Sequence, residues 1–392
     1  MSVWIVNPFD NLPAEGSRPL RFWLLARAFV AAGHRVVYWT SSFSHTAKAP
    51  RPLPAQFEAE GITVRLVPTP PYARNVGFGR IRNHRQFART WQRLAIAEGA
   101  AEAPAVIVAS LPPLATGHVA LALGQRYGAK VIADVMDDWP GTFYRLFPRG
   151  LRFLARLASA TLERARNRFL RGADRVIAVS ERYAELARAV GAKHVRRIYH
   201  GIECAPRVMR STAQFDALHL VYLGSMGRTY DLMTLLEAMV ELPTATLELI
   251  GAGEQEASLK AATERLGLGA RVKFRGYLSG EAIRERLAQA NCGIIPMHSE
   301  SCVGIPYKLA DYACAGLAIV SSLAGESAEL LVSSGAGALY SPANVSSLVA
   351  TLKAVAPRLS EMGTRARELA ETTFDAASLY RDYVRGVLEE RE

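Results

Sequence analysis

The sequence predicts an α/β protein built from two Rossmann-like, doubly wound domains that face each other across a cleft. Short apolar runs rich in β-branched residues alternate with amphipathic helical segments along the 392 residues, which is the pattern of a parallel sheet. The alternation restarts after the polar stretch 204–214, and the length suits two domains of ordinary size. In such sheets a ligand binds beyond the carboxyl ends of the strands.

The first domain is predicted over residues 1–203. Its strands are expected where apolar runs are shortest and most β-branched, at Val3–Asn7, Arg35–Thr40, Thr63–Val67, Ala105–Ser110, Lys130–Val135 and Arg175–Ser180. Its helices are expected where apolar residues recur every three or four positions, at Leu20–Ala32, Arg80–Ala97, Ala115–Tyr127, Leu151–Leu170 and Glu181–Val190.

The second domain is predicted over residues 204–375 by the same criteria. Its strands are expected at Leu218–Leu223, Thr246–Ile250, Val272–Arg275, Gly293–Pro296 and Ala318–Ser321. Its helices are expected at Leu232–Val240, Gln255–Leu266, Glu281–Ala290, Lys308–Ala315 and Ser346–Ala356, with a further helix starting at Glu326. An amphipathic helix follows within residues 376–392, and its packing against the first domain is left open by the sequence.

The four cysteines have no C-x-x-C spacing and lie at Cys204, Cys292, Cys302 and Cys314. This spacing argues against a disulfide framework and against a zinc site, and it fits a reducing cytosol. No Asp-x-Asp pair and no group with metal-ligand spacing occurs, so no metal and no cofactor are expected.

Neither a signal peptide nor a membrane span is predicted. The first residues, Met1–Pro8, are apolar but lack a basic segment before them. The longest uncharged stretch, Ala103–Gln125, is interrupted by Pro112 and Pro113, so it is interpreted as a strand, a loop and a helix.

The positive charge is concentrated in the first domain. Residues 1–200 carry 29 Lys and Arg against 13 Asp and Glu, whereas the remaining residues carry 18 against 23. Five arginines alternate with apolar residues in the predicted helix 151–170, and a second basic block spans residues 80–85. Two interpretations remain open: docking on an anionic membrane, and helices that face the core with a solvated basic side in an arginine-rich protein.

The segment from Gly304 to Asp311 is the strongest signal for chemistry. A glycine loop leads into a helix with Pro306 near its start, so the free N–H groups of the first turn form an anion site. Lys308 lies in that turn, where a cation is normally disfavoured, which indicates an anionic ligand. Asp311 follows on the same face, where a carboxylate can bind ribose hydroxyls. The alternative is an ordinary surface Lys–Asp pair.

This segment resembles the nucleotide-sugar site of glycosyltransferase family 4, of the two-domain architecture called GT-B and of the bacterial polysaccharide and O-antigen type. Asp311 matches the second glutamate of the family's Glu-x7-Glu motif, and Val303 occupies the place of the first. Other resembling stretches occur in the family's order along nearly the whole chain: Gly33–Val37, Asp134–Pro140, Ala173–Ser180, Tyr199–Ile202, Tyr222–Arg228 and Ile250–Gly253.

The resemblance implies a set of donor-binding residues in the second domain. Lys308 is expected to bind the diphosphate, together with Gly224, Gly304 and Ile305. The family's usual Arg and Lys in the loop after the first strand are replaced by Ser225 and Tyr230, so Arg228 is the candidate for the missing cation. Glu326 is expected either to contact the donor or to cap its helix.

In the first domain the loop Gly16-Ser17-Arg18 and Asp137 are the candidates for acceptor binding. Arg18, and with it Arg21, is expected to contact an acceptor phosphate or else to lie on the surface at a helix start. Asp137 follows a central strand, where a carboxylate can hold or deprotonate an acceptor hydroxyl. A helix cap at Asp137, or the same role for Asp138, is the alternative.

These residues together predict a metal-independent, retaining glycosyltransferase. The expected donor is a nucleoside-diphosphate sugar, UDP in preference to GDP, and it is a substrate rather than a cofactor. The expected acceptor is a lipid-linked or free saccharide in bacterial surface polysaccharide assembly, at the inner face of the cytoplasmic membrane. The catalytic residues would be Asp137, Lys308 and Arg228. A sugar-nucleotide epimerase on the same scaffold is the alternative, and a nucleic-acid-binding protein is suggested by charge alone.

Overall fold

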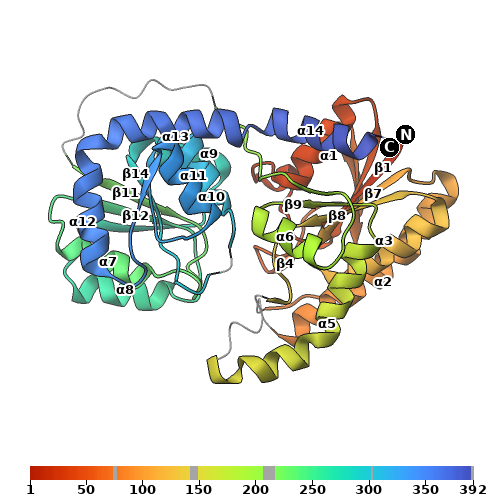
Figure 1. Cartoon of the computed structure of the whole chain (residues 1–392), viewed down its shortest axis with the longest axis horizontal. Coiled ribbons are helices and arrows are strands. Elements are labelled where there is room, and N and C mark those ends of the chain that lie inside the picture. The colour runs from red at the N-terminus through yellow and green to blue at the C-terminus, as the bar shows by residue number, and fades with distance from the viewer. Residues whose placement is uncertain (74–76, 142–148, 206–216, 302, 390–392) are drawn as a thin grey trace. The chain divides into compact units, whose positions relative to one another are not determined.

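The computed structural model describes residues 1–73, 77–141, 149–205, 217–301 and 303–389. It divides the chain into a first unit, Met1–Gly201 with Ala377–Glu392, and a second unit, Ile202–Ala376. The sequence places these boundaries after residues 203 and 375. The C-terminal helix belongs to the first unit, where it runs beside the first helix of the chain (Figure 1).

The first unit contains an eight-stranded sheet of order β10-β9-β8-β7-β1-β2-β6-β5. Its strands are β1 (Ser2–Val6), β2 (Arg35–Ser41), β5 (Gln56–Ala59), β6 (Ile62–Val67), β7 (Val106–Leu111), β8 (Lys130–Val135), β9 (Arg175–Ala178) and β10 (Val195–Arg197). All the pairs are parallel except that of β5 with β6. The strand order reverses between β1 and β7, which makes the carboxyl ends of these two strands the topological switch point.

Helices cover this sheet because its strands are apolar on both faces. The helices are α1 (Arg21–Ala31), α2 (Phe78–Ala101), α3 (Leu114–Tyr127), α5 (Arg152–Gly172), α6 (Glu181–Ala189) and α14 (Ala376–Leu388). One core cluster joins the strands to α2 and α3 through Trp4, Trp39, Phe87, Trp91 and Leu123. A small antiparallel pair, β3 (Phe43–Ser44) and β4 (Ala49–Pro50), lies in the connection after β2.

The second unit contains a six-stranded parallel sheet of order β13-β12-β11-β14-β15-β16. Its strands are β11 (His219–Leu223), β12 (Thr246–Ile250), β13 (Val272–Gly276), β14 (Cys292–Ile295), β15 (Ala318–Ser321) and β16 (Gly337–Leu339). Its helices are α7 (Leu232–Val240), α8 (Glu256–Arg265), α9 (Gly280–Gln289), α10 (Tyr307–Cys314), α11 (Glu326–Ser334), α12 (Val345–Val355) and α13 (Leu359–Thr373). The switch point lies between β11 and β14. The predicted doubly wound fold is confirmed in both units.

A buried ion pair ties the C-terminal helix to the first unit. Arg21, at the start of α1, donates from Nε to both carboxylate oxygens of Asp134 at 2.9 and 3.1 Å, and both side chains are fully buried. The hydroxyl of Tyr383, on α14, donates to the same carboxylate at 2.9 Å. Because a buried charge must stay paired, Arg21 is a structural residue, and its predicted role in binding an acceptor phosphate is wrong.

The long uncharged stretch forms β7 and α3, as predicted from its two prolines. Within the residues that the structure describes, no helix has both the length and the apolar character needed to cross a bilayer.

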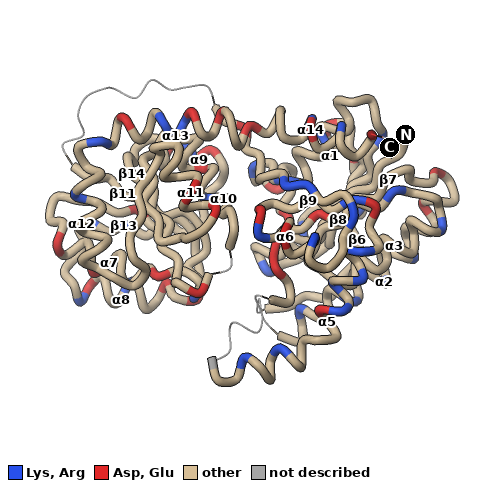
Figure 2. The backbone as a smooth tube through the Cα atoms, in the orientation of Figure 1, with Lys and Arg blue, Asp and Glu red and all other residues tan. Residues whose placement is uncertain are grey.

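Helix α5 differs from its neighbours because its first turns leave apolar side chains in solvent. Figure 1 shows its start extending beyond the other helices of its unit, and Figure 2 shows Lys and Arg recurring along it. Phe153, Leu154 and Leu157 are 69%, 59% and 57% exposed, while Phe169 and Leu170 at the other end are buried. A core-facing helix with a solvated basic side therefore describes only the second half of α5.

Candidate donor and acceptor sites

At the switch point of the second sheet, a tyrosine from α10 is hydrogen-bonded to both strands, β11 and β14. The backbone N–H of Leu223, at the end of β11, donates to the Tyr312 hydroxyl oxygen at 2.8 Å, and that hydroxyl donates to the carbonyl of Ile294 on β14 at 3.3 Å. A side chain at Gly293 would overlap the Tyr312 ring, so glycine there lets α10 lie against the sheet. These contacts fix the helix that carries Lys308 and Asp311.

The glycine loop and helix predicted from Gly304 to Asp311 have the expected local structure. Pro306 is the N-cap of α10, with φ −76° and ψ 145°, and the helix starts at Tyr307. Ile305 is buried, and the Ser327 hydroxyl, in the first turn of α11, donates to the carbonyl of Gly304. The first turns of α10 and α11 are therefore held together beside adjacent strands.

Lys308 is buried at this edge with aromatic rings around its ammonium group. Its Nζ lies 3.7 Å from the centre of the Tyr230 ring and 4.3 Å from that of Tyr222. Its side chain is 6% exposed, and no residue described in the structure accepts a hydrogen bond from Nζ. Burial lowers the pKa of Lys308 well below its usual value, and the nearby charge of Asp311 offsets part of that effect. A buried ammonium without an acceptor is costly, so it marks a place for a ligand anion.

Glycines bring the β11 loop close to this lysine. A Cβ at Gly224 would lie 3.0 Å from Lys308 Nζ. The N–H of Gly224 donates to the carbonyl of Ile250 at 2.9 Å, and Gly251, at φ 128°, packs against Gly224 so closely that any side chain would overlap it. Both positions therefore require glycine, and the absence of a side chain at Gly224 leaves the Lys308 ammonium uncovered on that side.

Not every residue predicted to bind the sugar donor lies beside Lys308. The side chain of Arg228 is 86% exposed and pairs with Glu254 at 3.4 Å. Glu326 begins α11, next to the Ser327 that holds the Gly304 loop. Gly304, Ile305, Asp311 and Gly224 all lie at the carboxyl edge of the sheet with Lys308.

Sequence reasoning missed the three tyrosines that shape this site. Tyr222 and Tyr230 form the walls around the Lys308 ammonium, and Tyr312 holds the helix in place. One signal was present, because Tyr230 stands where the family usually has a cation. Tyr222 and Tyr312 lie in apolar runs and could not be told from core residues.

In the first unit, the candidate acceptor residues lie at the carboxyl ends of strands. Gly16 has a left-handed conformation at φ 74° and ends the short turn after β1. Arg18 follows Gly16 in the chain. The pKa of His200 is lowered first by burial, then by the charge of Arg21 and then by that of Arg18, so Arg18 lies near this imidazole. Ser17 lies between Gly16 and Arg18 and is partly buried.

The carboxylates after β8 have different partners. Asp138 is buried and pairs with Arg166 at 3.2 Å and Arg182 at 3.9 Å, which gives it a structural role. Asp137 is partly buried, and its charge acts on the guanidinium of Arg80, whose pKa burial lowers and Asp137 partly restores. Of the two carboxylates, Asp138 is the more deeply buried and is held by two arginines, so Asp137 remains the candidate for contact with a ligand.

A disulfide lies near the far end of α10. Cys204 and Cys314 are bonded, with their Cα atoms 5.3 Å apart, so the prediction that the cysteines are unpaired is wrong for these two. The two cysteines are 110 residues apart in the sequence and come together only in the folded chain, so no local spacing reveals the pair. Cys292 is a buried thiol, and Cys302 lies outside the described residues. Cysteine usage therefore no longer indicates a reducing compartment.

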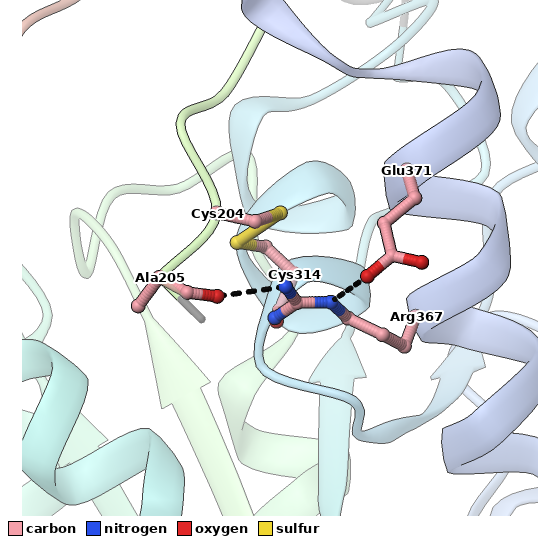
Figure 3. Close-up of a disulfide and its surroundings, with 5 residues drawn as sticks. All are labelled: Cys204, Ala205, Cys314, Arg367 and Glu371. Carbon is pink, nitrogen blue, oxygen red and sulfur yellow. Dashed lines mark hydrogen bonds and ion pairs between the residues drawn. A yellow bond between two sulfur atoms is a disulfide. The ribbon is translucent and has the colours of Figure 1, made fainter. Parts of the chain in front are cut away.

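An arginine reinforces this attachment. Arg367 donates to the carbonyls of Ala205 and Cys314, both at 2.7 Å, and pairs with Glu371 on its own helix (Figure 3). The segment that enters the second unit is thus fastened to the end of the helix that carries Lys308.

The residues that the structure describes contain no group of three or more His, Cys, Asp or Glu side chains placed to hold a metal ion.

Comparison with known proteins identifies the family. A family model described as glycosyl transferase 4-like domain matches residues 20–201, and one described as glycosyl transferases group 1 matches residues 217–356. The chain belongs to the family 4-like glycosyltransferases. No sequence among the curated proteins matches it. Membership of this family supports glycosyl transfer over the two alternatives from the sequence, epimerisation and nucleic-acid binding.

Solved structures share the two-domain GT-B fold. Sucrose-phosphate synthase from Thermosynechococcus elongatus has a TM-score of 0.76 at 17% identity, covering 98% of this chain and 97% of its own. HepE from Anabaena, solved with UDP-glucose, has a TM-score of 0.68 at 16% identity, covering 98% of each chain. WaaG, a glycosyltransferase of lipopolysaccharide biosynthesis, has a TM-score of 0.67 at 15% identity, covering 99% of this chain and all of its own. At these identities the likeness shows the fold.

Proposed function

We propose that this glycosyltransferase takes its sugar from a nucleoside-diphosphate donor bound to the second unit, UDP in preference to GDP. The buried Lys308 ammonium carries the proposal, because it lies at the switch point with aromatic rings but no hydrogen-bond acceptor among the described residues. Diphosphate oxygens would supply charge-assisted hydrogen bonds to it. HepE, which shares the fold, was solved with UDP and with UDP-glucose, which supports the choice of base.

The other residues of the edge complete this donor site. Gly224 leaves the space of a side chain open beside Lys308. The backbone at Gly304 borders the diphosphate, and the N-terminus of α10 adds its dipole. Asp311 binds the ribose hydroxyls, while Ile305 and Glu326 border the donor. Lys308, with Arg228 swung from Glu254, stabilises the departing diphosphate without a metal ion. The configuration at the anomeric carbon is retained, with the leaving phosphate on the same face as the incoming acceptor hydroxyl.

We propose that the acceptor is a saccharide, free or lipid-linked, held by the first unit at Gly16, Ser17, Arg18 and Asp137. Asp137 accepts the proton of the acceptor hydroxyl or orients it. The reaction would serve surface polysaccharide assembly in bacteria. The exposed apolar and arginine side chains of α5 support work at the anionic inner face of the cytoplasmic membrane, because they suit insertion at the headgroup level.

Calorimetry with UDP tests the donor proposal. Lys308→Ala is expected to weaken UDP binding more than tenfold, on the order of 1.5–3 kcal/mol for a charge-assisted contact. Lys260→Ala removes the same charge from an exposed lysine of the same unit and should bind UDP like the wild type. The wild-type affinity should be equal in EDTA and in magnesium, and GDP should bind more weakly. Equal UDP affinity for the two variants would remove Lys308 from the site.

A further inference from the structure

A second group of cations and rings, unrelated to the donor site, lies within the first unit. It comprises six side chains from four separate segments, and we call it the basic-aromatic cluster. Its members are Phe9 after β1, His45 and Lys48 around the β3–β4 turn, Tyr72 after β6, and Arg80 and His84 on α2.

Ring contacts hold the cluster together around Phe9. The imidazoles of His45 and His84 pack edge-on against the Phe9 ring, with centroid distances of 5.4 and 5.2 Å. The Arg80 guanidinium lies 5.4 Å from the centre of the same ring, and Lys48 Nζ lies 4.7 Å from that of Tyr72. These cation–π contacts place two positive charges against aromatic rings at one edge of the sheet.

The hydrogen bonds of the cluster fix which imidazole nitrogens accept. Arg80 Nε donates to Nε2 of His84 at 3.3 Å. Nδ1 of His45 contacts the Tyr72 hydroxyl, and Lys48 Nζ lies 3.3 Å from the same nitrogen. Because an ammonium can only donate, Nδ1 is the acceptor nitrogen of His45. Burial, with the charges of Lys48 and Arg80, lowers the pKa of His45 to about 3, and burial with Arg80 does the same for His84. Both rings are therefore neutral at ordinary pH.

A neutral imidazole that accepts at one nitrogen donates at the other. His45 thus carries its proton on Nε2 and His84 on Nδ1, in the same cluster as the ammonium of Lys48 and the guanidinium of Arg80. Every polar group that the cluster can offer to a ligand through these four side chains is a donor. A group with only acceptors, and with negative charge, is the chemical complement of such a set.

We infer that the basic-aromatic cluster binds an anionic group, phosphate or carboxylate, carried by the acceptor. The inference rests on the proposed function and specifies its acceptor class. Arg80 links the cluster to the candidate base, because the charge of Asp137 acts on its guanidinium. The Phe9 and Tyr72 rings provide apolar faces on which an adjoining sugar ring can stack. An acceptor anchored by its anion would place a neighbouring hydroxyl near Asp137.

Anion titration of the whole protein, with the donor site filled by saturating UDP, tests the inference. The probes are glucose 6-phosphate, glucuronate and glucose, and the readout is the NMR signal of labelled histidines, with those of His45 and His84 assigned by substitution. The phosphate or the carboxylate sugar is expected to shift both signals saturably, whereas glucose should bind at least tenfold more weakly. The stronger of the two anions identifies the group on the acceptor.

Variants separate a site from general attraction. Arg80→Gln and Lys48→Gln should each weaken binding of the anionic sugar at least tenfold and leave UDP affinity unchanged. Arg85→Gln removes an equal charge from an exposed position one turn along α2 and should bind like the wild type. Equal losses in Arg80→Gln and Arg85→Gln, or no saturable shift in the wild type, would overturn the inference. If the wild type does not bind UDP, the proposed donor site is overturned instead.

Discussion

Both units place cations at the carboxyl edge of a parallel sheet, but they surround them differently. In the second unit one ammonium, on Lys308, is buried against two tyrosine rings, and a carboxylate lies one turn along its helix. In the first unit the charges of Lys48 and Arg80 are shared among two imidazoles and two rings. Under the two proposals, the second unit would bind its ligand mainly through one buried ammonium, and the first through several weaker donors.

This contrast predicts that the first unit contributes to turnover and the second to donor binding. One substitution can separate these two effects. Asp137→Asn keeps the size of the side chain but removes its charge, so it should lower turnover on the order of a thousandfold, as expected for a lost general base. UDP affinity should stay unchanged, because the donor contacts lie in the other unit. Steady-state kinetics and calorimetry on the same preparation check both. Normal turnover, with the protein folded, would leave Asp137 no part in the reaction.

A second test asks whether membrane docking also belongs to the first unit alone. Changing Arg152, Arg156 and Arg164 on α5 to Glu should lower the affinity for anionic vesicles, measured by cosedimentation, at least a hundredfold. Each basic side chain contributes roughly 1 kcal/mol near such a surface. Binding of the wild type should also weaken as salt is raised.

The matched control lies in the acidic half of the chain. Changing Arg265, Arg284 and Arg358 to Glu alters the net charge equally on exposed positions of the second unit. This variant should sediment with vesicles like the wild type, and both variants should bind UDP. A wild type that ignores anionic vesicles at low salt would exclude the membrane from the proposed function.

A third test concerns acid stability. His45 and His84 have pKa values of about 3 in the folded protein, against about 6.5 when unfolded, so below pH 6.5 the unfolded chain takes up protons that the folded state refuses. The free energy of unfolding should therefore fall as pH drops from 6.5 toward 3, by at most about 1.4 kcal/mol per pH unit for each histidine.

Denaturant unfolding at several pH values measures this slope. The variant His84→Gln should flatten it, whereas His298→Gln, at an exposed position of the second unit, should not. An unchanged slope in His84→Gln would mean that the imidazole is solvated, and the donor assignment within the basic-aromatic cluster would fail with it.

The two sites also differ in how far the sequence reveals them. The residues Gly304 to Asp311 are contiguous, so the loop, the helix start and the position of Lys308 follow from local rules about capping and periodicity. The basic-aromatic cluster joins residues between 9 and 84 that share no spacing, and His45 and His84 each look like an isolated histidine. Only the strand order brings them together.

The same reason explains the errors. Arg21 resembles a surface arginine at a helix start, and its partners Asp134 and Tyr383 are far away in the chain. Cys204 and Cys314 likewise meet through the fold. Strands and helices with strong periodicity were predicted well, whereas the short edge strands β5, β10 and β16 and helix α13 were not. Short edge strands bury little, so their apolar pattern is weak.

The Arg21–Asp134–Tyr383 contact has a consequence for how the protein is made. A ribosome delivers the chain from its N-terminus, and domains tend to fold as their sequences emerge. All residues of the second unit, 202–376, emerge before Tyr383, so that unit can fold while the first still lacks its last helix. Until Tyr383 emerges, the Arg21–Asp134 pair lacks the hydroxyl that donates a hydrogen bond to the Asp134 carboxylate. We expect the second unit to mature first on the ribosome, and the unit that begins the chain to mature last.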